Sequence, residues 1–533
     1  MQTNNKKEIV KYFLEQNILI SHDLLERLDE QMFAVIKERL GKLKGERLFL
    51  AKGELDALLS KDKEEPWRKD IFEGKNPPHI TAAQKKTNEK DAFEHKHTEP
   101  AYFEDIDQKN SDSIDRCNRV SIIASYNEPP KKQDIQNFIK HYNSRFKALE
   151  SMLRNRPELQ NLNSIGRVLQ KKERETTSII GIVKEKIVSG GKIKIVFEDL
   201  SGEIPVIVDK SKSELFSQAQ NITEDEVLGV LGISSGRVLY ANSFYWPDVP
   251  LNKEIRKSPD KAYAMFLSDL HIGSKKFLRP EFEKFLRWLN NPGDNERHRD
   301  IVENLKYLFI IGDLVDGVGI YPGQEAELEL TDIYKQYDEC ARLLRQIPEY
   351  VSIIICPGNH DALRLSEPQP PIYKEFAPGI YNLKNVTIVS NPALVNIHAS
   401  KIFSGFDVLM YHGYSFDYFL QNIEHIRANG GYDRADLVMK FLLQRRHLSP
   451  THTATLYVPD PLRDPLIINK VPDFFVTGHI HKTAVSNYRN VSLICGSCWQ
   501  AKTAFQERVG HHPEPARVPV VNLQTRETRI LRF

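Results

Sequence analysis

Five short polar motifs between residues 266 and 481 constrain this chain more than any other feature. They are Asp-X-His, Gly-Asp-X-X-Asp, Gly-Asn-His-Asp, His-Gly and Gly-His-X-His segments, which start at Asp269, Gly312, Gly358, His412 and Gly478. All but the last follow a short run of apolar or β-branched residues, which is typical of strands buried on both faces, and the last follows Phe474-Phe-Val-Thr477. The polar residues are therefore expected on loops just past strand ends, where α/β sheets usually place active sites.

The residue types in these motifs suit a centre of two divalent ions. Carboxylate, imidazole and amide oxygen together favour borderline ions such as Mn²⁺, Fe²⁺ or Zn²⁺. Two ions roughly 3.5–4 Å apart can activate a water and hold both oxygens of an in-line phosphoryl displacement. The candidate ligands are Asp269, His271, Asp313, Asn359, His412, His479 and His481.

Their spacing suggests how the ligands share the ions. Asp269 and His271, one residue apart, can approach the same ion, and the central Asp313 could bridge both. Asn359 and His412 offer an amide oxygen and an imidazole to the second ion. The last two histidines alternate across a turn, so that one can serve each ion.

Two residues next to these ligands are candidates for catalysis. His360 can point past the metal towards a substrate phosphate, where an imidazole can protonate the leaving alkoxide. Asp361 is expected to hold the tautomer of that imidazole through a hydrogen bond. One such motif alone is usually a polar turn, but coincidence is a poor explanation for five in this order.

The motifs resemble the signature of calcineurin-like metallophosphoesterases over about residues 260–510. The resemblance implies a two-sheet α/β sandwich with a dinuclear metal site between strand ends and His360 as the acid. It implies one ion on Asp269, His271, Asp313 and His481, and the other on Asp313, Asn359, His412 and His479.

Composition limits the setting of this site. A chain of 533 residues predicts roughly three or four domains. The formal net charge is only +2, so any nucleic-acid contact must come from local basic patches and metal ions. Five cysteines, no signal peptide and no long apolar run favour a reduced cytoplasmic compartment and no membrane contact. Cys495 and Cys498 are expected to be buried structural residues.

Three regions precede the motifs, and together they predict a multidomain α+β fold. Residues 1–76 are predicted to form a helical domain, and the polar residues 77–128 a flexible linker. Residues 129–250 are expected to begin with an amphipathic helix over 130–155 and to continue as a five-stranded OB-fold barrel of the oligonucleotide-binding type. Residues 251–533 would form the α/β two-sheet metallophosphoesterase sandwich.

Two basic clusters allow more than one interpretation. The first lies on predicted barrel strands and could contact a phosphate backbone or form an ordinary solvent face: Lys184, Lys186, Lys192 and Lys194. The second could line the entry to the metal site, although a charged helix face is slightly favoured: Lys440, Arg445, Arg446 and His447.

This order of parts resembles the small subunits of archaeal family D DNA polymerases, a family that includes the eukaryotic B subunits. Matching phrases are Phe266–Ser274, Gly312–Gly317 and Trp499-Gln500. The resemblance implies a proofreading 3′–5′ exonuclease that removes mismatched or single-stranded 3′ ends of DNA. Its partner would be a large catalytic subunit, and its cofactor two divalent ions, with Mn²⁺ expected and Mg²⁺, Fe²⁺ or Zn²⁺ as alternatives. The eukaryotic relatives have lost metal ligands, whereas every position is filled here.

Other functions share parts of this pattern. A stand-alone repair nuclease of the double-strand-break type carries the same metal motifs, but it typically begins with the phosphoesterase domain. Here the first candidate ligand is residue 269. A non-catalytic scaffold is disfavoured by the complete ligand set, and a phosphoprotein phosphatase by the barrel.

Overall fold

The computed structural model describes residues 19–20, 49–50, 120–129, 131–171, 173–508 and 510–533. The chain divides into two units, Met1–Ile106 and Asp107–Phe533. In the first unit, strands β1 (Leu19–Ile20) and β2 (Phe49–Leu50) pair in parallel. The predicted helices of residues 1–76 and most of the predicted linker lie outside the described residues.

The end of the predicted linker is a strand. Strand β3 (Val120–Ser125) pairs antiparallel with β13 (Ala393–Ile397) at the edge of a sheet. Extending the linker to residue 128 was therefore wrong. The strand's partner comes from a distant part of the chain, so local composition could not reveal the pairing.

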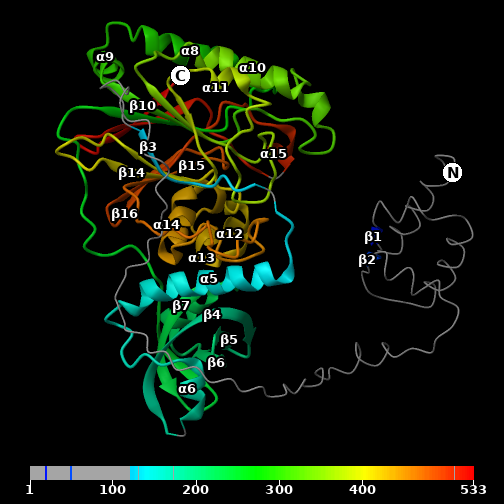
Figure 1. Cartoon of the computed structure of the whole chain (residues 1–533), viewed down its shortest axis with the longest axis vertical. Helices are drawn as coiled ribbons and strands as arrows, with labels where there is room; N and C mark the ends of the chain where they lie inside the picture. Colours follow the sequence, from blue (N-terminus) through cyan, green and yellow to red (C-terminus); the bar gives the residue numbers. More distant parts are fainter. Residues whose placement is uncertain (1–18, 21–48, 51–119, 130, 172, 509) are drawn as a thin grey trace, which may run out of the picture. The chain divides into compact units, whose positions relative to one another are not determined.

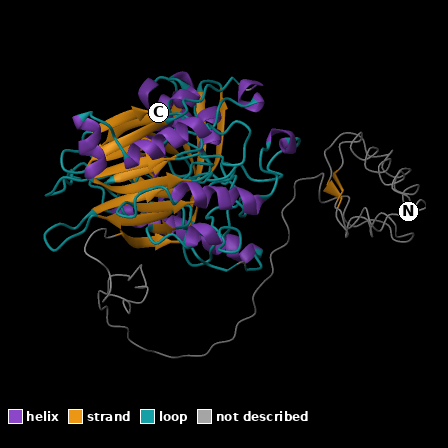
Figure 2. Cartoon of the chain, turned by 90° about the horizontal axis from the view of Figure 1, so that it is seen from above, coloured by secondary structure: helices purple, strands orange, loops and turns teal. Residues whose placement is uncertain are grey.

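Two six-stranded sheets organise the second unit (Figures 1 and 2). The first sheet has the order β12-β11-β10-β9-β18-β19, and the second has the order β16-β17-β15-β14-β13-β3. The six strands of the first sheet are β9 (Tyr263–Leu267), β10 (Leu305–Ile311), β11 (Ser352–Cys356), β12 (Val386–Ile388), β18 (Arg517–Asn522) and β19 (Thr528–Arg532). The remaining strands of the second sheet are β14 (Phe406–Met410), β15 (Phe474–Thr477), β16 (Ala484–Tyr488) and β17 (Val491–Cys495).

Strand direction brings the loops of interest together. In the first sheet β9, β10 and β11 are parallel, and in the second β14 and β15 are parallel. The carboxyl ends of parallel neighbours meet at the same edge of a sheet. The loops that follow these five strands carry all five polar motifs.

Apolar side chains fill the space between the sheets and beneath the outer helices. Phe266 and Phe309 of the first sheet pack with Phe406 and Phe474 of the second in one buried cluster. Helices α8 (Arg279–Asn290) and α10 (Ile333–Leu344) cover the first sheet, and α12 (Phe416–Asn422) and α14 (Ala435–Arg445) cover the second. The predicted α/β sandwich and its doubly buried strands are confirmed.

The other helical elements of the sandwich are α9 (Glu296–Glu303), η1 (Gln324–Glu327), α11 (Pro378–Tyr381), α13 (Glu424–Ala428), η2 (Gly431–Asp433) and α15 (Ala504–Arg508).

A closed five-stranded barrel lies in the chain between β3 and the other strands of the sandwich. Its strands run in the order β4-β5-β6-β8-β7, and α6 (Ile165–Gln170) and α7 (Ser213–Gln220) flank it. Alternate residues of β5 and β6 are buried inside it, which fits the period of two expected for strands with one buried face. The strands are β4 (Glu175–Ser189), β5 (Lys192–Asp199), β6 (Gly202–Asp209), β7 (Val227–Ser234) and β8 (Leu239–Tyr245).

Helix α5 (Ile135–Arg154) lies between the barrel and the helices of the second sheet (Figure 1). Asp134 caps its first turn by accepting a hydrogen bond from the backbone of Asn137. The predicted apolar face is buried only in its C-terminal half, and Ile135 remains 77% exposed. Across the described parts of the chain, α5 and the other helices are too short or too polar to cross a membrane.

Candidate metal centre

The loops after five strands bring the seven predicted ligands to one place. Asp269 and His271 follow β9, Asp313 follows β10, and Asn359 follows β11. The second sheet contributes the remaining three histidines from the loops after β14 and β15. Two groups of predicted ligands result, each with ligand atoms within 4.8 Å of one another: Asp269, His271 and His481, and Asp269, Asp313 and His412. A third group joins His271 to Asp316 and His360.

The first group is almost fully buried. Nε2 of His271 lies 3.1 Å from Nε2 of His481. Oδ1 of Asp269 lies 3.4 Å from the His481 nitrogen and 4.0 Å from the His271 nitrogen. These three side chains are the ones expected to share one ion.

The second group surrounds His412. Its Nε2 lies 3.0 Å from Oδ1 of Asn359 and 3.3 Å from Oδ2 of Asp313. The same Asp313 oxygen lies 3.8 Å from Nε2 of His271, so this carboxylate of the second group also reaches the first, as a bridging ligand would. The ring of His479 is 5.3 Å from that of His412.

The orientation of the rings fits a cation. Nδ1 of His412 is 2.9 Å from the carbonyl of Ile311, which can only accept, so Nδ1 carries the proton. Nε2 then faces the oxygens of Asp313 and Asn359, where its lone pair would bind an ion. Burial alone would lower the pKa of His412, but the Asp313 carboxylate outweighs it and raises the pKa to about 10. A divalent ion between these atoms would provide the same positive charge.

The ligand loops have an unusual backbone. Five candidate ligands adopt a positive φ, which non-glycine residues rarely do and which clusters at functional sites. The motif glycines allow close approach: a Cβ on Gly358 would lie 2.2 Å from Oδ1 of Asp313, and one on Gly478 would lie 2.6 Å from Oδ2 of Asp269. The five ligands and their φ values are Asp269 (53°), His271 (50°), Asp313 (50°), His479 (69°) and His481 (56°).

His360 lies beside the ligands, as expected, but Asp361 does not hold it. Nδ1 of His360 donates to the backbone carbonyl of Asp316 at 2.8 Å, which directs Nε2 away from that contact. The Asp361 carboxylate instead accepts hydrogen bonds from the hydroxyl of Tyr337 and the backbone N–H of Gly358. The predicted hydrogen bond between Asp361 and His360 is therefore wrong, and Asp361 fixes the loop that carries Asn359.

Several residues that orient the ligands were missed. Asp316, the second carboxylate of its motif, lies 3.1 Å from Nδ1 of His271 and accepts from Gln500. Oδ2 of Asp417 lies 3.0 Å from Nε2 of His479. Such partners set the direction of a metal-bound imidazole. The motif spacing could have identified Asp316, whereas Asp417 belongs to no motif.

A pair of buried amides connects the two sheets behind the site. Asn391 accepts from the backbone N–H of His412 at 2.9 Å and donates to Gln369 at 2.9 Å. Gln369 in turn donates to the carbonyl of Gly358 at 3.1 Å. This chain fixes the loop after β14 relative to the loop after β11.

The basic cluster at the end of α14 does not line the metal centre. Arg445 is buried beside Glu226 of the barrel, with Nε 3.3 Å from its carboxylate. Arg446 donates to the carbonyl of Ile468, and His447 contacts Asp464. These three side chains join α14 to neighbouring parts of the fold, so the entry role is wrong for them, and only Lys440 of this cluster lies on an exposed helix face.

The barrel lysines differ among themselves. Lys184 forms an ion pair with Glu203. Lys186 donates to the carbonyls of Gln220 and Ile222, and burial lowers its pKa. Intramolecular partners therefore engage two of the four lysines. The buried position predicted for Cys495 and Cys498 is confirmed, and their thiols are not joined in a disulfide.

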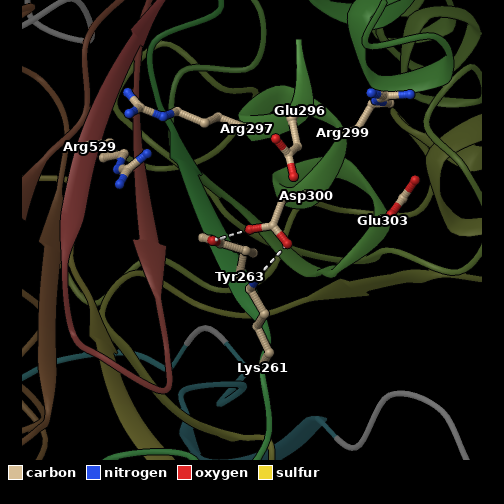
Figure 3. Close-up of a pocket in the computed structure, with 8 residues that line it drawn as sticks. All are labelled: Lys261, Tyr263, Glu296, Arg297, Arg299, Asp300, Glu303 and Arg529. Carbon is tan, nitrogen blue, oxygen red and sulfur yellow. Dashed lines mark hydrogen bonds and ion pairs between the residues drawn. The ribbon is translucent and has the colours of Figure 1, made fainter. Parts of the chain in front are cut away.

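A charged pocket of about 520 Å³ lies at the opposite end of β9 (Figure 3). Its central Asp300 accepts from the hydroxyl of Tyr263 at 2.8 Å and pairs with Lys261 at 2.5 Å. Strand geometry places Tyr263 about 20 Å from Asp269, so this pocket is separate from the candidate metal centre.

Comparisons with known proteins agree with this arrangement. Residues 264–483 match the model of the calcineurin-like phosphoesterase family. The DNA polymerase II small subunit of Pyrococcus furiosus is 42% identical over 72% of this chain and 61% of its own length. That of Methanothermobacter thermautotrophicus is 38% identical over 73% of this chain and 78% of its own length. The small subunit of Archaeoglobus fulgidus is 40% identical over 73% of this chain and 75% of its own length.

The matched region spans less than two thirds of the Pyrococcus furiosus relative. It nevertheless includes most of the present chain in all three comparisons. The chain belongs to the family of archaeal DNA polymerase II small subunits and carries a phosphoesterase-family domain.

Proposed function

We propose that this chain is a metal-dependent 3′–5′ exodeoxyribonuclease that proofreads for a DNA polymerase. The observation that carries the proposal is the convergence of seven ligand-type side chains from two sheets beside the half-buried His360. Membership of the polymerase small-subunit family supports DNA as the substrate.

The ligand set would hold two divalent ions, with Mn²⁺ as the expected metal. Asp269, His271 and His481 would hold one, Asn359, His412 and His479 the other, and Asp313 would bridge them. When bound, such ions activate a water and neutralise charge on the phosphate. Asp316 and Asp417 orient His271 and His479 from behind.

His360 would act on the leaving group. Its Nδ1 proton is held by the carbonyl of Asp316, so the ring has a fixed direction and Nε2 can carry a proton towards the substrate. Transfer of that proton to the departing 3′ oxygen of the preceding nucleotide would complete hydrolysis of the terminal phosphodiester. The hydrogen bond from the His360 backbone N–H to Oδ1 of Asp313 keeps this ring next to the bridging carboxylate.

The other parts of the chain would serve binding. A closed five-stranded barrel with exposed Lys192 and Lys194 suits the oligonucleotide-binding type and could guide single-stranded or mismatched 3′ ends. The relatives are named small subunits, which supports a large catalytic subunit as partner. DNA synthesis would then belong to that partner.

The test is degradation of a primer with a 3′ mismatch by the full chain in Mn²⁺, alone and with its large subunit. His360→Ala should lower the cleavage rate by roughly 10²- to 10⁴-fold, because a general acid contributes about that much. Metal content, measured by elemental analysis, should remain that of the wild type. His425→Ala, in the exposed part of α13, is the matched control.

Each alternative has its own outcome. Cleavage only in the presence of the large subunit would support a partner-dependent exonuclease. Cleavage of intact duplex ends without any preference for a 3′ mismatch would favour a repair nuclease. Inactivity of the wild type in both settings would overturn the exonuclease and leave a scaffold.

A further inference from the structure

Two half-buried aromatic rings lie beside the candidate metal centre and have no role in the mechanism above. Tyr432 of η2 and His511 come from distant segments, yet their ring centroids are 4.0 Å apart with an interplanar angle of 37°. We call these two residues the aromatic pair. Each ring keeps part of its surface open to solvent.

One carboxylate connects the aromatic pair to the metal centre. Asp417 accepts a hydrogen bond from the Tyr432 hydroxyl at 2.9 Å through Oδ1, and its Oδ2 lies 3.0 Å from Nε2 of His479. The phenol ring therefore starts one carboxylate away from a candidate ligand.

The position of Tyr432 is fixed on more than one side. Gln421 donates to its hydroxyl at 3.0 Å, and the neighbouring Asp433 forms an ion pair with Lys482 at 2.6 Å. Lys482 follows the ligand His481 directly in sequence, so the η2 turn is tied to the ligand loop. These contacts place the Tyr432 ring next to the ligand loop.

A third ring extends the aromatic surface. Tyr414 meets the His479 ring edge to face, with centroids 5.8 Å apart. Aromatic faces stack with any nucleobase, because every base has a π-face. A phosphate at the metal centre would thus have an aromatic surface within reach of its base.

We propose that the aromatic pair is a stacking platform for the base of the 3′-terminal nucleotide. This inference rests on the proposed exonuclease and names the form of DNA that it prefers. A base-paired terminal nucleotide is already stacked in its duplex, whereas a mismatched or single-stranded base can leave it and stack on the pair. Selection of frayed ends would then need no hydrogen-bond recognition of the base.

The experiment compares two single-stranded oligonucleotides that differ only at the 3′ end, one with a terminal thymidine and one with a terminal abasic residue. The wild type should cleave the thymidine end with a KM about 5- to 100-fold lower, which corresponds to the usual strength of base–aromatic stacking. Tyr432→Ala and His511→Ala should reduce that preference towards unity. Tyr432→Phe loses the same hydrogen bond to Asp417 but keeps the ring, so it should retain the preference.

A binding measurement separates the platform from the chemistry. An oligonucleotide with 2-aminopurine at its 3′ end, bound in Ca²⁺, should be quenched by the wild type and by Tyr432→Phe but not by Tyr432→Ala. Tyr381→Ala, which removes a tyrosine ring on α11 away from the ligand loops, is the control and should behave as the wild type.

The outcomes distinguish this inference from the function on which it rests. Equal cleavage of both ends by an active wild type, or unchanged quenching by Tyr432→Ala, would overturn the platform and leave the exonuclease intact. Failure to cleave either oligonucleotide, with the large subunit present, would overturn both.

Discussion

Two buried clusters in this protein are built from the same residue types and do opposite things. In the Asp464 cluster, consisting of Asp464, Arg145, His141 and His447, a fully buried carboxylate is flanked by two histidines. The candidate metal centre likewise sets the buried Asp269 and Asp313 among histidines. The difference lies in what balances the negative charge.

In the Asp464 cluster a side chain supplies that balance. Nε of Arg145 lies 2.6 Å from Oδ2 of Asp464, with His447 at 2.8 Å and His141 at 3.3 Å from the same oxygen. Burial would raise the pKa of Asp464, but Arg145 and the histidines hold it well below its usual range. Within the described parts of the chain, the ion pairs of Asp269 and Asp313 involve only histidines. The Asp464 cluster contains its own cation, Arg145. The candidate metal centre has the residue composition of a site that binds a metal cation.

The largest expected effect comes from a substitution in the candidate metal centre. Asp313→Asn removes the carboxylate between the two groups, so the cleavage rate and the affinity for Mn²⁺ should both fall by more than about 100-fold, beyond the usual effect of an outer-shell change. The free energy of unfolding in EDTA should also fall, because the neighbouring histidines hold the pKa of Asp313 well below its usual range and an amide loses that charge pairing. Cleavage assays, metal analysis and urea unfolding measure the three quantities. Retained Mn²⁺ binding would contradict the bridging position.

The next largest effect comes from a substitution in the Asp464 cluster. Arg145→Met leaves Asp464 buried without its cation and should lower the free energy of unfolding by about 3–5 kcal/mol. Cleavage per folded molecule should stay unchanged, because this cluster takes no part in the chemistry. Arg154→Met on the same helix, which removes an exposed pair with Glu150, should lower it by less than about 1 kcal/mol. Equal losses of unfolding free energy in the two variants would show that Arg145 does not balance a buried charge.

The smallest effect uses pH to sharpen the comparison. Burial lowers the pKa of His447 to about 4, below the roughly 6.5 of an unfolded histidine. Between these values the unfolded chain binds more protons, so the contribution of this histidine is present above pH 6.5 and is lost as the pH falls towards 4. In EDTA, wild type should lose up to about 3 kcal/mol more than His447→Gln across that range. Parallel curves from urea unfolding would show that His447 titrates normally.

How far the sequence predicted the molecule depended on whether an interaction was local. The seven candidate ligands could be predicted to meet because each follows a buried strand, and the ends of parallel strands coincide. The barrel strands could be located because β5 and β6 alternate with a period of two. These patterns repeat within a few residues and leave a clear signal.

Interactions between distant segments left no such signal. Arg445 and His447 resemble a surface cluster until Glu226 and Asp464 are placed beside them. Asp361 follows His360 in sequence but faces the opposite side of its loop, towards Tyr337. Asp417 could not be assigned to His479 because nothing in its neighbourhood marks the contact.

The left-handed backbone of the ligand loops limits which substitutions related proteins can accept at the ligand positions. Five ligands occupy conformations that Asn, Asp and Gly tolerate far better than β-branched residues do. A relative that lost its ions but kept the loops would still be restricted at these positions, so Asn or Gly should replace a lost Asp or His more readily than Val or Ile. The sequence of a chain that no longer binds metal would therefore still show, at these five positions, the residue types that a left-handed backbone allows.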